Sequence, residues 1–278
     1  MAAQSSNASL LHRLGVKYGT DKADAHNYLV VYDEVFSPLR ESVHRMLEIG
    51  VYRGSSILMW RDYFTNAEVV GMDIFSKIDI KSQHIAASGR WNSFFNAAAR
   101  GDHGPRVKAV KCNSSKESHL RRFIDGERRN ATTFDLIIED GSHMQRDQHM
   151  IFARLFPLVK PGGIYVIEDL QSGWTTGFDE PKASENTTVQ MLSRLQQFGR
   201  IRPNKYINDT SARYLEQWIE SVQVVAPPKR VWTRHLTSIV HKRLARASDD
   251  VRPRVDIRGF SGIDPPPKRT PSIWHLVE

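Results

Sequence analysis

Short apolar runs alternate with helical segments along the middle of this sequence. The runs "RMLEI", "AEVVGMD", "RVKAVK", "FDLII" and "GGIYVI" are predicted strands, and amphipathic segments follow several of them. Strands that alternate with helices at this spacing form a parallel, doubly wound sheet. Right-handed crossovers place the carboxyl end of every strand at one edge, which is where ligands bind. We therefore predict an α/β fold with a doubly wound, mainly parallel sheet.

The flanking regions define three parts of the chain. Residues 1–45 are predicted to form a helical cap, because Tyr28, Val31, Tyr32 and Val35 have helical spacing before Pro38. Residues 46–226 form the ligand-binding catalytic domain, with further helices near 185–198 and 211–219 and a strand at 221–225. Residues 227–278 form a basic extension that completes or decorates the same domain. It carries eleven Lys/Arg against five Asp/Glu and ends in one more candidate strand, "SIWHLV".

Composition narrows the class of protein. Hydrophobic residues make up 40% of the 278 residues and charged residues 25%, as in a soluble globular protein. No apolar run approaches the ~20 residues of a membrane span, and the first residues lack the layout of a signal peptide. The single cysteine, Cys112, excludes an internal disulfide. We therefore expect a cytoplasmic protein without membrane contact.

A glycine turn follows the first strand and indicates the cofactor. Glu48, Gly50 and Gly54 have the pattern E-x-G-x-x-x-G, which lets a ligand approach the backbone at the start of a helix. The G-x-G-x-x-G of a dinucleotide site is missing. The spacing suits S-adenosyl-L-methionine, with Asp73 accepting hydrogen bonds from the ribose and Asn113 contacting the adenine.

Two later strands both end in Ile-Glu-Asp. The first pair of acids lies in "IEDGSH" and the second in "IEDL", and both fall at the ligand edge of the sheet. Asp140, Glu168 and Asp169 would repel one another unless a cation lay between them. Oxygen ligands without a nearby cysteine indicate Mg²⁺ or Mn²⁺. A metal there would acidify a substrate hydroxyl, and His143 could accept the proton as the catalytic base.

These motifs together resemble the metal-dependent sugar O-methyltransferases of macrolide antibiotic biosynthesis, the mycinamicin and macrocin type. The resemblance covers residues 15–172 and includes "YGTDK" at 18–22. It implies a Rossmann-like methyltransferase sheet, metal ligands at Asp140, Glu168 and Asp169, and His143 as the base. It also implies cofactor contacts at Thr20, Gly50, Ser56 and Asp73, and we place Asp140 in the cofactor set as well as in the metal set.

The sequence departs from that family at four places. It has "CNSS" after the third strand instead of Gly-Asp-Gln-Ser, and Glu139 instead of Asp in front of Asp140, where we expect it to face away from the metal. The segment 78–104 and the basic end beyond residue 225 have no match in the family. The helix within 78–104, from about Arg90 to Arg100, is either a lid or oligomer contact, or a surface helix that packs its aromatic side chains inward.

Three functions remain open at this point. The first is a Mg²⁺-dependent O-methyltransferase for a small hydroxylated metabolite such as a sugar, polyketide or phenol. The second is a carboxyl O-methyltransferase that esterifies an aromatic or other small acid, suggested by the net charge of +8. The third is a nucleic-acid-directed or non-catalytic binding protein, disfavoured because aromatic residues do not alternate with the basic ones. We expect a small-molecule acceptor as partner and leave a homo-oligomer open.

Overall fold

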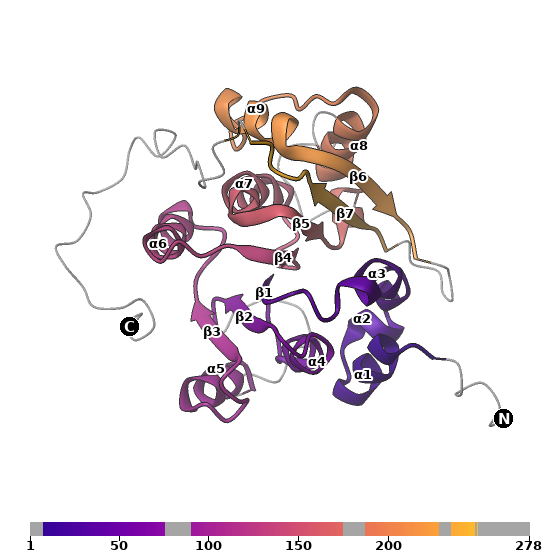
Figure 1. The fold of residues 1–278 in the computed structure, drawn as a ribbon, viewed down its shortest axis with the longest axis vertical. Coiled ribbons are helices and arrows are strands. Elements are labelled where there is room, and N and C mark those ends of the chain that lie inside the picture. The colour runs from indigo at the N-terminus through magenta and orange to yellow at the C-terminus, as the bar shows by residue number, and fades with distance from the viewer. Residues whose placement is uncertain (1–7, 76–89, 175–186, 228–234, 248, 250–278) are drawn as a thin grey trace.

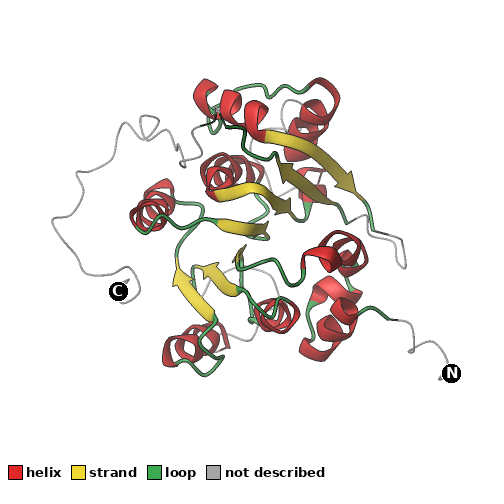
Figure 2. Ribbon diagram, viewed as in Figure 1, coloured by secondary structure: helices red, strands yellow, loops and turns green. Residues whose placement is uncertain are grey.

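The structure, a computed structural model, describes residues 8–75, 90–174, 187–227, 235–247 and 249. These residues form a seven-stranded sheet with helices on both sides (Figure 1, Figure 2). The strands are β1 Arg45–Ile49, β2 Glu68–Asp73, β3 Val107–Lys111, β4 Phe134–Glu139, β5 Val159–Ile167, β6 Ile219–Val225 and β7 Thr237–Lys242. Among the described residues, every helix is too short or too polar to cross a lipid bilayer.

The helices alternate with the strands over most of the chain. The α-helices are α1 Leu10–Tyr18, α2 Asp21–Asp24, α3 Tyr28–Phe36, α4 Ser55–Tyr63, α5 Arg90–Arg100, α6 Glu117–Arg129, α7 Gln145–Leu155, α8 Thr188–Phe198 and α9 Asp209–Trp218. Three short 3₁₀ segments are η1 Ser37–Leu39, η2 Phe156–Leu158 and η3 Leu170–Trp174. The helix predicted before Pro38 and the five predicted alternating strands are all confirmed.

The strand order is β3-β2-β1-β4-β5-β7-β6. The first five strands are parallel, whereas β7 is antiparallel to both β5 and β6. The doubly wound, mainly parallel sheet is therefore confirmed. Because β1 and β4 are neighbours and β4 pairs with β5, the carboxyl ends of these three strands lie side by side.

Alternating strand residues point into two hydrophobic cores. On one face, Leu47 and Ile137 pack with α6, α7, α8 and α9. On the other face, Met46 and Leu136 pack with α1, α3 and α4. Figure 1 shows these two groups of helices on opposite sides of the strands. The predicted N-terminal cap thus completes the second core.

Helix α6 and strand β7 were not predicted. All six residues of β7 are buried or partly buried, so the strand lacks the alternation that marks an exposed one. The candidate strand "SIWHLV", residues 78–89 of the unmatched segment and most of the basic extension lie outside the described residues. Within α5, Phe94 is buried and contacts Phe75, which agrees with the inward-packing alternative.

Candidate active site

The glycine turn brings the ends of β1 and β4 into close contact. Gly50 has φ +91°, and a Cβ there would lie 1.8 Å from the carbonyl oxygen of Asp140. Gly54 has φ +83° directly before α4, and its Cβ would lie 2.0 Å from the ring of Phe94. Both positions therefore require glycine for backbone conformation and for space. The turn that the sequence predicts is formed, with the amino end of α4 beside it.

Asp73 holds this turn against the end of β2. Its carboxylate accepts hydrogen bonds from the backbone N–H groups of Val51 (2.8 Å), Tyr52 (3.3 Å) and Phe75 (2.9 Å). A carboxylate has about four acceptor positions, so these bonds leave room for a ribose hydroxyl. The predicted ribose contact stays a prediction, and the structure adds a second task for Asp73, which is to fix the turn.

The other predicted cofactor residues differ in accessibility. Glu48 is fully buried, and its carboxylate accepts a hydrogen bond from Ser56 Oγ (2.8 Å). Asn113 follows β3, and its side-chain oxygen accepts a hydrogen bond from the backbone N–H of Ser115 (3.1 Å). Thr20 precedes α2, two residues before Lys22. The buried Glu48 side chain thus connects β1 to the start of α4, and its predicted contact with the cofactor stays a prediction.

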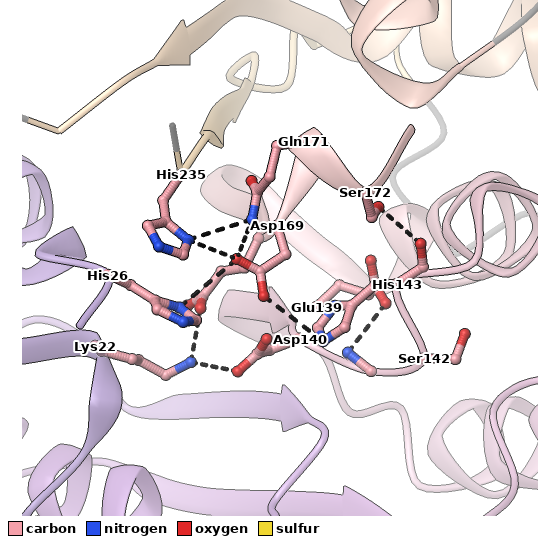
Figure 3. A network of polar contacts seen from close by, with 12 residues as sticks. Lys22, His26, Glu139, Asp140, Ser142, His143, Asp169, Gln171, Ser172 and His235 are labelled. Carbon is pink, nitrogen blue, oxygen red and sulfur yellow. Dashed lines mark hydrogen bonds and ion pairs between the residues drawn. The ribbon is translucent and has the colours of Figure 1, made fainter. Parts of the chain in front are cut away.

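Asp140, His143 and Asp169 come together at the carboxyl ends of β4 and β5. Their ligand atoms lie within 4.8 Å of one another, and His143 Nε2 is 3.6 Å from Asp169 Oδ2 (Figure 3). His143 and Asp169 both have left-handed backbones, at φ +58° and +53°. Such strain at non-glycine residues is typical of functional sites and needs support from the surroundings. Ser172 gives part of that support, because its hydroxyl donates to the His143 carbonyl (2.8 Å).

Glu168 lies behind this group. Its side chain has no exposed surface, and its two carboxylate oxygens accept hydrogen bonds from Lys22 Nζ (2.8 Å) and Tyr32 Oη (2.9 Å). Asp140 and Asp169 are more accessible, with 22% and 13% of their side chains exposed. The predicted set of three carboxylates is therefore adjacent in space, but the structure brings only two of them together with His143.

Negative charge dominates the buried part of the site. Lys22 Nζ lies 2.6 Å from Asp140, 2.8 Å from Glu168 and 3.4 Å from Glu48. Burial alone lowers the pKa of Lys22, but the three carboxylates outweigh it and raise that pKa well above its usual value. Burial raises the pKa of Glu48, Asp140 and Glu168, with Lys22 opposing the effect. One ammonium thus leaves these acids short of positive charge.

Asp169 is the exception among the acids. Burial tends to raise its pKa, but His143, His26 and hydrogen bonds outweigh that effect, and the pKa is lowered. Its Oδ1 accepts hydrogen bonds from Tyr28 Oη (2.6 Å) and Gln171 Nε2 (2.9 Å). Asp169 therefore stays ionised next to His143.

The donor set fits a hard divalent cation. Asp140 and Asp169 offer carboxylate oxygens at the accessible edge, and the surrounding acids have surplus negative charge that a divalent cation would offset. Asp169 also groups with His26 and His235. Their rings are stacked, with centroids 4.2 Å apart and planes at 19°. Because nitrogen lone pairs lie in the ring plane, two stacked rings cannot both direct them at one ion, so this second group does not fit a metal.

Several residues of the site were not predicted. No role was assigned to Lys22, His26 or His235. The sequence analysis used Tyr28 and Tyr32 only as apolar positions of a helix. The quoted motif "YGTDK" contains Lys22, but the motif alone does not say that its lysine is buried among acids. Only the approach of the N-terminal helices to β4 and β5 reveals it (Figure 3).

A known protein family matches the central part of the chain. Residues 47–170 match a family model described as a methyltransferase domain. This stretch contains the glycine turn, Asp73, Asp140, His143 and Asp169. The chain therefore contains a methyltransferase domain. The match lies within residues 46–226, and the predicted boundaries of the catalytic domain stay a prediction.

The relatives are sugar O-methyltransferases, as the sequence motifs predicted. The chain is 31% identical over 202 residues to an 8-demethyl-8-α-L-rhamnosyl tetracenomycin-C 2'-O-methyltransferase of Streptomyces olivaceus, covering 70% of this chain and 47% of that one. It is 30% identical over 196 residues to the mycinamicin VI 2''-O-methyltransferase of Micromonospora griseorubida, covering 66% and 43%. The chain thus spans about half the length of the relatives that it matches.

A solved structure agrees with this relationship. The MycE methyltransferase from the mycinamycin biosynthetic pathway, in complex with Mg and SAH, matches with a TM-score of 0.59 at 25% identity. The match covers 86% of this chain and 56% of that chain. The predicted resemblance to the macrolide sugar O-methyltransferases is therefore confirmed.

Proposed function

We propose that the chain is a Mg²⁺-dependent O-methyltransferase that transfers the methyl group of S-adenosyl-L-methionine to a hydroxyl of a small metabolite. The observation that carries this proposal is the group of Asp140, His143 and Asp169 at the ligand edge, next to the glycine turn. The names of the relatives favour a sugar hydroxyl on a polyketide as the acceptor. Because this chain covers less than half the length of those relatives, we extend their activity to it only as a proposal.

The cofactor would lie over the turn at Gly50 and Gly54. There the backbone permits close approach, Asp73 can accept ribose hydroxyls, and Asn113 lies at the end of the neighbouring strand. The hydrogen bond that Ser56 donates to Glu48 would help to hold the turn in place. Thr20 completes the proposed set from the N-terminal cap.

The residues around Asp140 and Asp169 would hold the divalent cation. Glu168 lies next to both but is hydrogen-bonded to Lys22 and Tyr32, so as a ligand it would have to exchange a partner. A cation bound there would make an acceptor hydroxyl more acidic. His143 Nε2, 3.6 Å from Asp169, would accept the hydroxyl proton, and the acceptor oxygen would then attack the methyl carbon as the sulfonium leaves as a thioether.

A methyl-transfer assay tests this proposal. The chain is incubated with methyl-labelled S-adenosylmethionine and a panel of glycosylated polyketides, phenols and aromatic acids, with EDTA or with Mg²⁺. We expect labelling of hydroxylated acceptors that EDTA abolishes and Mg²⁺ restores. Full activity in EDTA would contradict the metal assignment, and labelling of aromatic acids alone would favour the carboxyl O-methyltransferase.

Two substitutions assign the roles within the group. His143→Ala should lower kcat by about 10²- to 10⁴-fold, the usual contribution of a general base, while binding of S-adenosylhomocysteine stays unchanged. His44 is an exposed histidine directly before the amino end of β1, away from the ligand edge. His44→Ala is the matched control and should keep full activity. Asp140→Asn should weaken Mn²⁺ binding, measured by the free Mn²⁺ signal in electron paramagnetic resonance. Equal activity of His143→Ala and wild type would remove His143 from the mechanism.

A further inference from the structure

Lys22 is a fully buried lysine whose role the proposed reaction does not explain. It lies in α2, and only 1% of the residue is exposed. An isolated ammonium is costly to bury, so a buried lysine is tolerated where carboxylates surround it. Here the carboxylates come from the ends of three adjacent strands, with Glu48 on β1, Asp140 after β4 and Glu168 after β5. Lys22 therefore links the N-terminal cap to the centre of the ligand edge.

The contacts of Lys22 use oxygens that belong to the proposed metal site. Its Nζ lies 2.6 Å from Asp140 Oδ2 and 2.8 Å from Glu168 Oε2. Tyr32 occupies the other oxygen of Glu168 at 2.9 Å. These bonds fix both acids without a metal ion. The same bonds compete with a metal for the same carboxylates, and the ammonium repels any divalent cation a few ångströms away.

We propose that Lys22 is a positioning residue that keeps the acidic site assembled in the absence of metal and weakens the binding of the divalent cation. This inference rests on the proposed metal-dependent function. The lysine places one positive charge among Glu48, Asp140 and Glu168. This charge offsets the repulsion between the three carboxylates, so they can pack together without a metal ion. A divalent cation then binds to Asp140 and Asp169 at the accessible edge with moderate affinity, and exchanges readily.

Replacement of Lys22 by methionine tests the two halves of this inference. Met has a similar length and no charge, so Lys22→Met leaves three buried carboxylates without their ammonium. We expect its melting temperature to fall in EDTA and to recover with Mg²⁺, while that of the wild type changes little. We also expect its Kd for Mn²⁺, measured from the free Mn²⁺ signal, to be at least about tenfold lower than that of the wild type, because a nearby positive charge has been removed.

Two further variants make the result interpretable. Lys17→Met, at an exposed lysine of α1 that pairs with Asp62, is the matched control and should bind Mn²⁺ like the wild type. Lys22→Met combined with Glu48→Gln removes one negative charge together with the positive one. This double variant covers the case in which Lys22→Met alone does not fold. It should fold in EDTA and still bind Mn²⁺ more tightly than the wild type.

The outcomes separate this inference from the proposed function. If the wild type binds Mn²⁺ and Asp140→Asn does not, the proposed metal site is supported. In that case, an unchanged or higher Kd for Mn²⁺ in folded Lys22→Met or in the double variant overturns the role of Lys22. Unchanged stability of Lys22→Met in EDTA overturns it as well, as does a double variant that fails to fold even with Mg²⁺. Absence of Mn²⁺ binding in all of these proteins overturns the metal assignment itself and this inference with it.

Discussion

The last residue of β4, Glu139, makes the stability of this protein depend on pH in a direction that can be measured. Its side chain is buried, and one oxygen accepts a hydrogen bond from the backbone N–H of Gly141 at 3.3 Å. The other oxygen, Oε2, is buried without a hydrogen-bond partner among the described residues. Burial, with Asp140 and Asp147 nearby, raises the pKa of Glu139 from 4.5 to about 8. Glu139 is therefore protonated in the folded protein at neutral pH.

The sign of the effect follows from the protons bound in each state. Between pH 4.5 and 8 the unfolded chain loses the Glu139 proton, whereas the folded chain keeps it. Stability therefore falls as pH rises through this window, by about 1.4 kcal/mol per pH unit. Glu139→Gln removes the titration and keeps the size of the side chain. As pH rises from 5.5 to 7.5, the unfolding free energy of the variant should increase relative to that of the wild type by about 2 to 3 kcal/mol, slightly less than two pH units at the full slope.

Urea unfolding at several pH values between 5.5 and 7.5, in metal-free buffer, measures this difference. The difference between wild type and Glu139→Gln isolates Glu139, because every other residue is the same in both proteins. Glu41→Gln, at an exposed glutamate, is the control and should run parallel to the wild type across the range. A Glu139→Gln curve parallel to the wild-type curve would refute the reasoning, since it would mean that Glu139 ionises in the folded state.

Three other substitutions test the ligand edge. Gly50→Ala should destabilise the fold by about 2 kcal/mol or more in urea unfolding, because φ is +91° and its Cβ would meet the Asp140 carbonyl; a neutral result would refute the close approach. Asp73→Asn should raise the Kd for S-adenosylhomocysteine at least about tenfold in calorimetry, because Val51 and the turn lose a charged acceptor; equal affinity would remove Asp73 from the site. Ser172→Ala should lower kcat with little change in KM, because the His143 carbonyl loses the shorter of its two hydrogen bonds and keeps that from Gln145 (3.4 Å); a change confined to KM would count against this.

The sequence alone determined the order of the five strands β1 to β5 and the glycine turn, but not helix α6 between β3 and β4. Each of these depends on local patterns, which are apolar runs of strand length, helical periodicity after them, and glycines where the backbone turns. The parallel arrangement also followed, because strand–helix alternation permits few other topologies. Strand β7 did not follow, because it inserts between β5 and β6 and its side chains are nearly all buried.

The acids at the site show the same division. The sequence placed Asp140 and Asp169 at one edge, because parallel strands end on the same side of the sheet. It could not separate Asp169 from Glu168, which precedes it directly. Glu168 continues inward to Lys22, whereas the backbone of Asp169 turns at φ +53° and directs the carboxylate toward His143. Nor could it find Lys22, which lies 118 residues before Asp140. Local pattern fixes where a strand ends, but only the packing of the N-terminal helices on those ends decides which acids receive a lysine and which stay accessible to a metal and substrate.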